Sequence, residues 1–283
     1  MRNLSFVHYQ VISALSDIIM PRVFGYTECM SWASRRRFII LSLIGAVAAA
    51  FFIILSISVF YKAPSCSDGV QNQGEAGIDC GGPCPYLCTA DEHTPTVLFT
   101  KALPSGAGRT DIIASIENVN ANAAAKSVPY TVTLYGVGQV LIQRASGTVD
   151  LPPGATVPVF LPGVVNGNQQ VMGAFLTIDS SKPRWFAMAS DPRVMPVVSN
   201  TTLSGSTASP RIDAILANPS TSALTDVPAV VLVHDAGGEV IAASRTIVPS
   251  IPAQGQATAT FTWNAAFTAA PAAIEVIPVV PLP

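Results

Sequence analysis

A run of 24 residues without a charged side chain, 38–61, constrains this chain more than any other feature. As a helix rising about 1.5 Å per residue it would extend about 36 Å, enough to cross a hydrocarbon core about 30 Å thick. Hydrophobic residues make up 49% of the 283 residues and charged residues 11%, which excludes a disordered chain. Because no other stretch is long enough, the sequence predicts a single transmembrane helix at 38–61, in contact with membrane lipid.

Charge on the two sides of this run predicts its orientation. Five arginines and two acidic residues precede it, and Arg35, Arg36 and Arg37 lie directly beside it. The 222 residues after it carry ten basic and fifteen acidic groups. Because basic flanks stay in the cytoplasm, we expect a single-pass protein of the cell membrane with residues 1–37 inside and the C-terminal part outside. A cleaved signal peptide is the alternative, but the apolar run is too long and no small-residue cleavage site follows it.

The cytoplasmic segment 1–37 has a pattern of its own. Leu4, Val7, Val11 and Leu15 recur at helical spacing, with polar residues between them. This is typical of an amphipathic helix lying in the membrane interface. A short frayed tail is the alternative, and the sequence does not choose between the two.

Four of the five cysteines follow the span within one stretch of 23 residues: Cys66, Cys80, Cys84 and Cys88. An even number in an oxidising compartment predicts two disulfides, and three pairings are open. The segment 62–95 is rich in glycine and proline and too poor in apolar residues to fold without cross-links, so we expect a cysteine-rich module and stalk. A zinc site from Cys80, Cys84 and Cys88 is the weaker alternative, because these cysteines are spaced too widely for common zinc motifs.

Oxygen donors alternate with glycines in the same module. Asp68, Asn72, Glu75 and Asp79 are spaced four, three and four residues apart. Flexible loops of such residues bind Ca²⁺, so these four residues are a candidate calcium site. The alternative is that they hold turns beside the disulfides. No other cofactor is expected.

The remaining chain reads as two copies of one unit, 96–198 and 199–283. Four landmarks recur in order about 100 residues apart: Asn118 with Asn218, Val128-Pro129 with Val227-Pro228, Leu151-Pro152 with Ile251-Pro252, and Phe160 with Phe261. Short runs of alternating apolar and polar residues predict antiparallel strands, about seven in each unit, as in an immunoglobulin-like or fibronectin-like β-sandwich. The predicted fold class is therefore an all-β ectodomain of two tandem immunoglobulin-like β-sandwiches, carried on one N-terminal transmembrane α-helix with a small disulfide-stapled module between.

Smaller signals place the turns of these units. Gly237-Gly238 and Gly136 predict hairpin turns, and Asn118 and Asn218 predict turn caps. The small polar residues of 199–209 are typical of a linker or long loop.

A longer motif spans the cysteine module. Its residues are Cys66-Ser67-Asp68-Gly69-Val70-Gln71-Asn72-Gln73-Gly74-Glu75, then Asp79-Cys80-Gly81-Gly82-Pro83-Cys84. This resembles the CxDGxxNxxExxxDCGGxC cassette of many secreted and surface bacterial proteins. The layout of anchor helix, cassette and tandem immunoglobulin-like or fibronectin-like β units resembles a family of uncharacterised single-pass bacterial surface proteins. The resemblance implies a surface location and a β fold, and it implies no particular activity.

Signals for an enzyme are missing from the sequence. It contains no GxSxG, HExxH, P-loop or GxGxxG motif, and the predicted exterior holds only His93 and His234. An acidic ectodomain disfavours nucleic acid as a partner. We therefore expect a non-enzymatic adhesin, scaffold or envelope subunit with a protein partner at the cell surface; an accessory or sensor subunit that binds a ligand is the alternative. The small residues Gly45 and Ala49 also allow self-association through the helix.

Overall fold

The computed structural model describes residues 32–60, 65–106, 108–167, 169–179 and 184–283. The chain divides into two compact units, 1–63 and 64–283. The expected amphipathic helix of the N-terminal segment, with Cys29, falls almost wholly outside the described residues.

The first unit contains the helix α2 (Trp32–Phe60). It begins six residues before the predicted span, so Arg35, Arg36 and Arg37 belong to its first turns, where the Arg36 guanidinium lies 5.3 Å from the centre of the Trp32 ring. Within it, Trp32–Val59 is long and apolar enough to cross a membrane, and no part of the described chain covers it.

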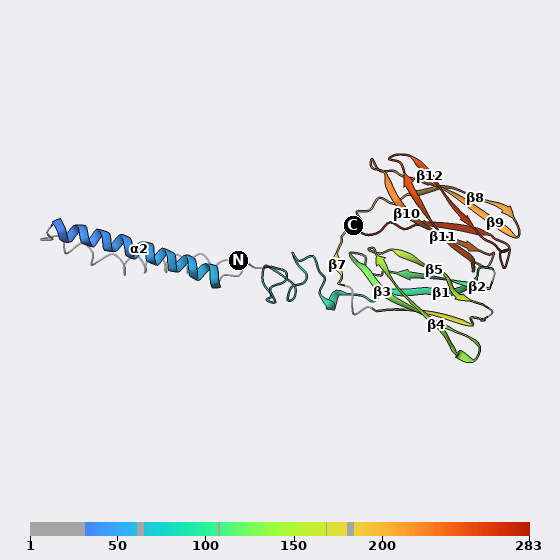
Figure 1. Ribbon diagram of the computed structural model, residues 1–283, viewed down its shortest axis with the longest axis horizontal. Helices are drawn as coiled ribbons and strands as arrows, with labels where there is room; N and C mark the ends of the chain where they lie inside the picture. The colour runs from blue at the N-terminus through green and yellow to red at the C-terminus, as the bar shows by residue number, and fades with distance from the viewer. Residues whose placement is uncertain (1–31, 61–64, 107, 168, 180–183) are drawn as a thin grey trace, which may run out of the picture. The chain divides into compact units, whose positions relative to one another are not determined.

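The regular secondary structure of the second unit is almost entirely antiparallel strands, which form four sheets (Figure 1). The sheets have the strand orders β1-β2-β5, β4-β3-β6, β11-β10-β13 and β12-β9-β8, and β7 also pairs with β3. The strands are β1 (Thr96–Pro104), β2 (Arg109–Glu117), β3 (Ala123–Tyr135), β4 (Leu141–Leu151), β5 (Thr156–Asn166), β6 (Gly173–Ile178), β7 (Phe186–Ala187), β8 (Val197–Ser206), β9 (Ser209–Ala217), β10 (Leu224–His234), β11 (Val240–Ile251), β12 (Gln256–Thr262) and β13 (Ala273–Pro278).

Each of two sheet pairs encloses an apolar core. In the first sheet pair, β1-β2-β5 packs on β4-β3-β6; in the second, β11-β10-β13 packs on β12-β9-β8. The first core includes Ile112, Ile116, Val132, Leu134, Leu151 and Trp185, and the second includes Ile212, Leu216, Val231, Ile251 and Phe261.

A third buried cluster joins the two sheet pairs to each other. Its members are Leu103, Ile113 and Phe160 from the first pair, and Val230, Leu232, Val240 and Ala243 from the second. The sheets β1-β2-β5 and β11-β10-β13 are thus covered on both faces, and the four sheets lie in layers (Figure 1).

Strand β10 shows how the sequence permits this arrangement. Ala229, Val231 and Val233 pack into the second core, whereas Val230 and Leu232 pack against the first sheet pair. Because both faces are buried, this part of the strand has no polar side, and residues 227–233 are an unbroken apolar run.

The expected linker at 199–209 is wrong. Strand β8 covers Val197–Ser206, and a tight turn pairs Ser206 with Ser209 at the start of β9. Threonine favours strands, and the polar composition reflects the exposure of most of this edge strand rather than the absence of structure. The expected boundary between units, 198/199, therefore falls inside β8.

The predicted equivalence of Phe160 with Phe261 is wrong by one residue. Ile112 pairs with Leu161, and Ile212 pairs with Phe261 in the same way. Leu161 therefore corresponds to Phe261 and faces a core, while Phe160 faces the opposite side, toward the second sheet pair. A shift of one residue moves a strand side chain to the other face.

Asn118 and Asn218 make corresponding hydrogen bonds, which confirms them as turn caps. Each side-chain amide donates to a carbonyl a few residues later in the chain and to a proline carbonyl. The Asn118 amide donates to Ala123 at 2.8 Å and to Pro152 at 2.6 Å. The Asn218 amide donates to Ser222 at 2.8 Å and to Pro252 at 3.1 Å. Each Oδ1 accepts the N–H two residues ahead, at Asn120 and Ser220.

Candidate functional site

The four clustered cysteines form two disulfides, Cys66–Cys84 and Cys80–Cys88. The predicted number of disulfides is confirmed, and the structure selects one of the three open pairings. The weaker alternative, a zinc site, is wrong for the disulfide-bonded protein, because no thiolate is left at Cys80, Cys84 or Cys88 to bind a metal.

The cysteine module is docked on the first sheet pair rather than held away from it as a stalk. The Leu87 N–H donates to the Trp185 carbonyl at 3.0 Å, and the Ala187 N–H donates to the Pro85 carbonyl. Tyr86 forms a bridge with Phe186, and the Arg184 guanidinium lies 3.7 Å from the centre of the Tyr86 ring. These bonds extend the pairing of β7 to the module.

The four candidate calcium ligands lie in this module and bind mainly its backbone. The Asp79 carboxylate accepts the N–H groups of Asp68 and Gly69 at 3.0 to 3.2 Å, and Glu75 Oε2 accepts those of Asn72 and Asp79 at 3.3 Å. The Asn72 amide donates to Asp68 at 2.9 Å. The carboxylate oxygens of Asp68, Glu75 and Asp79 do not all lie within 4.8 Å of one another, as a shared metal ion would require. This geometry favours the turn-holding role, and calcium binding stays a prediction.

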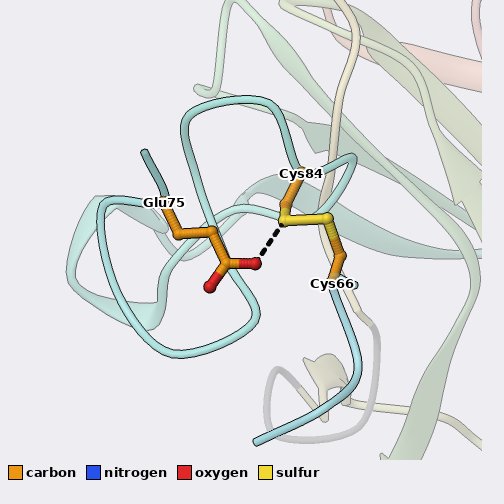
Figure 2. A group of neighbouring side chains, drawn as sticks. All are labelled: Cys66, Glu75 and Cys84. Carbon is orange, nitrogen blue, oxygen red and sulfur yellow. Dashed lines mark hydrogen bonds between the residues drawn. A yellow bond between two sulfur atoms is a disulfide. The ribbon is translucent and has the colours of Figure 1, made fainter. Parts of the chain in front are cut away.

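Glu75 contacts the disulfide that closes the module. Its carboxylate is buried, and Oε1 lies 2.9 Å from the Cys84 sulfur (Figure 2). The Cys84 sulfur is bonded to Cys66 and carries no hydrogen, so this is a close packing contact and not a thiol hydrogen bond. Cys66, Glu75 and Cys84 lie close enough to share a metal ion, but the oxidised sulfurs do not offer the thiolates that binding requires.

Neither described histidine has the surroundings of a catalytic base. The backbone of His93 bonds with the Asn120 side chain. His234 Nδ1 lies 3.1 Å from the Gly238 carbonyl in the β10–β11 turn, and Nε2 lies 3.6 Å from a Glu275 oxygen. No serine, threonine or cysteine nucleophile is hydrogen-bonded to either ring among the described residues.

Two clefts open along the contact between the sheet pairs. The smaller, of about 310 Å³, lies at the β1–β2 turn and is lined by groups that include Ser105, Arg109, Arg245 and Trp263. The larger, of about 550 Å³, is lined by groups that include Tyr130, Asp150, Arg193 and Arg245. Burial raises the pKa of Tyr130, and the positive charge of Arg245 opposes this rise.

Residues 279–283 run from β13 along the larger cleft onto the first sheet pair. The Leu282 N–H donates to Asp150 at 3.0 Å, and the Leu282 side chain is buried. Arg193 donates to the Val280 carbonyl and pairs with Asp191, whose pKa the hydrogen bonds from Arg193 lower. This segment adds a polar connection between the two sheet pairs.

Sequence reasoning named Phe160, Pro152 and Pro228 among the cleft residues only as repeat landmarks, and it assigned no cleft residue to a site. Ser105 and Trp263 lie more than 150 residues apart in the chain, and no short motif joins them. The only signal was the unbroken apolar run of β10, which indicates a strand covered on both faces and hence a contact with another sheet.

We expect all four cysteines of the module to resist alkylation until a reductant is added. Mass spectrometry of non-reduced peptides should recover one linkage between Cys66 and Cys84 and another between Cys80 and Cys88. A peptide joining Cys66 to Cys80, or free thiols at these positions in the folded protein, would contradict the structure. Cys29 serves as the internal control, because the sequence leaves it without a partner.

Comparison with known proteins assigns no family. No family model matches the chain, and no curated protein matches it significantly. Among solved structures, it is similar to a red sea bream transglutaminase (11% identity, TM-score 0.21, covering 66% of this chain and 29% of that one) and to a β-glucuronidase from glycoside hydrolase family 2 (12% identity, TM-score 0.19, covering 74% and 26%). The chain spans less than a third of the length of either enzyme. Similarity this low is no basis for assigning an activity.

Proposed function

We propose that this chain is a membrane-anchored, non-enzymatic binding or structural protein of the cell exterior. The observation that carries the proposal is the combination of one apolar helix, long enough to span a bilayer, with a cysteine module cross-linked by two disulfides ahead of the β strands. Disulfides persist in oxidising compartments, so they support an exterior location for residues 64–283. The absence of a histidine-linked nucleophile among the described residues is compatible with a binding role.

The proposal extends to the architecture of the β unit. The matching bonds of Asn118 and Asn218, and the matching pairs Ile112–Leu161 and Ile212–Phe261, support two copies of one immunoglobulin-like or fibronectin-like unit. Because the copies pack through a shared apolar cluster within one compact unit, they offer strand edges and loops to a protein partner together.

Thiol labelling on intact cells tests the topology. Ala223 is exposed in the loop between β9 and β10, so Ala223→Cys should react with a membrane-impermeant maleimide. Cys29 should react only after permeabilisation, and the mass of the purified protein should include residues 1–60. Labelling of Cys29 but not of residue 223 on intact cells would show that the protein has the opposite orientation. A mass lacking the N-terminal segment would identify a cleaved signal peptide instead.

A further inference from the structure

The smaller cleft gathers positive charge from both sheet pairs. Arg109 comes from β2 and Arg245 from β11, both are exposed, and neither has an acidic partner within ion-pair distance among the described residues. Asp111 is the one carboxylate that lines the cleft, and its Oδ1 accepts the Gly163 N–H at 2.7 Å. Two guanidinium groups therefore face one carboxylate, which leaves the cleft with a net positive charge suited to an anion.

A buried hydroxyl in the cleft has no partner. The Oγ atom of Ser105 is shielded from solvent and makes no hydrogen bond to any described residue. Buried polar atoms in folded proteins nearly always have a partner, either protein, water or ligand. Ser105 lines the cleft, so a rotation of its side chain would let this hydroxyl bond a hydroxyl or carboxylate group bound there.

An aromatic ring forms another part of the cleft wall. The Trp263 indole is held in place, because its Nε1 donates to the Ala243 carbonyl at 3.2 Å and its ring packs edge-to-face on Phe267 at 5.1 Å. Ser244, Thr262 and Asn264 add polar groups beside it. A fixed apolar ring among hydroxyl and amide groups suits a ligand with both C–H and O–H surfaces, such as a sugar.

The two sheet pairs approach each other closely beside the cleft. Gly106, in the β1–β2 turn, has a φ of +83°, and a Cβ at this position would lie 3.1 Å from the Ala265 Cβ. Only glycine fits this turn readily, so the turn beside Arg109 and the segment just after Trp263 are already in contact. A preformed site of this kind loses little freedom when a ligand binds.

From these observations we propose that the smaller cleft binds a carboxylate-bearing sugar. The two arginines bind the carboxylate, and Trp263 packs on the sugar ring. Ser105 and the neighbouring polar groups form hydrogen bonds with the ring hydroxyls. A volume of about 310 Å³ lies at the lower end of the range of ligand pockets, about 300–1,000 Å³, and suits one sugar unit. This inference rests on the proposed binding role and names the ligand class for it. The sugar is either a free monosaccharide or the terminal unit of an acidic polysaccharide.

Calorimetric titration of the full-length protein in detergent tests the proposal. Glucuronate should bind saturably, and glucose should bind at least ten-fold more weakly because it lacks the charged group. Arg109→Gln and Arg245→Gln should each weaken glucuronate binding about ten-fold. Arg144→Gln is the matched control, because Arg144 is an exposed arginine on β4 that lines neither cleft, and it should leave the affinity unchanged.

Further ligands distinguish a free sugar from the end of a polysaccharide, and a sugar site from a site for any anion. A glucuronate oligomer that binds more tightly than the monosaccharide assigns the site to a polysaccharide end, whereas equal affinity assigns it to the free sugar. Inorganic sulfate bound as tightly as glucuronate would show a bare anion site and overturn the sugar assignment. So would a lack of glucuronate binding, or equal binding by the arginine variants. These outcomes are separate from the thiol-labelling result, which tests the proposed membrane-anchored exterior protein independently.

Discussion

Replacing Phe261 by alanine is expected to lower the free energy of unfolding of the β unit by about 3–5 kcal/mol. Phe261 is 1% exposed, pairs with Ile212 and lies within the second core. Its removal leaves a cavity that the flanking strands cannot close. Because domains of this kind are stable by only about 5–15 kcal/mol, the variant should unfold at a much lower urea concentration, as followed by circular dichroism of the full-length protein.

The neighbouring Thr262 provides the matched control. Its side chain lies on the opposite face of β12 and is exposed, so Thr262→Ala should cost less than about 1 kcal/mol. Equal losses at the two positions would show that β12 does not present Phe261 to a core.

Replacing Trp185 by alanine is expected to have an effect of similar size, again about 3–5 kcal/mol. Trp185 is 2% exposed in the first core, and its carbonyl accepts the Leu87 N–H from the cysteine module. Loss of the indole therefore removes core packing and loosens the segment on which the module is docked. Urea unfolding should shift to lower concentration, and limited proteolysis should cut the segment 85–92 faster.

Trp32→Ala makes the same chemical change in a different setting. Trp32 is 76% exposed on α2, in the other unit, so its removal should leave the unfolding of the β unit and the proteolysis of 85–92 unaltered. If Trp185→Ala behaves like Trp32→Ala, Trp185 does not hold the module to the first core.

The elements of this structure that depend on local sequence could be predicted. The apolar run predicted the helix, the cysteine count predicted two disulfides, and alternating residues predicted antiparallel strands. Pro129 lies inside β3, the middle strand of its sheet, and not at a strand start or a sheet edge. Its carbonyl accepts the Asp179 N–H just beyond the last β3–β6 pair, Tyr130 with Ile178. The N–H that proline lacks therefore falls at the end of that ladder, where it costs at most the last bond.

The parts that depend on packing between distant segments could not be predicted. A serine- and threonine-rich edge strand and a linker have the same composition, so β8 was mistaken for a loop. The apolar run of β10 indicates that both faces of the strand are covered, but it does not say which segment covers the second face; in the structure Phe160 is one of the residues that do. The clefts follow from that contact between distant segments, which is why no local motif marks their residues as a site.

The layered stack also limits how this protein can vary over evolutionary time. The middle strands β2 and β10 are enclosed on both faces, so almost every substitution there disturbs one apolar cluster or another. Strands β4 and β8 lie at the edges of the outer sheets, where almost no side chain is fully buried. Side chains on these outer strands are therefore freer to differ between relatives, while the paired inner sheets keep the same shape.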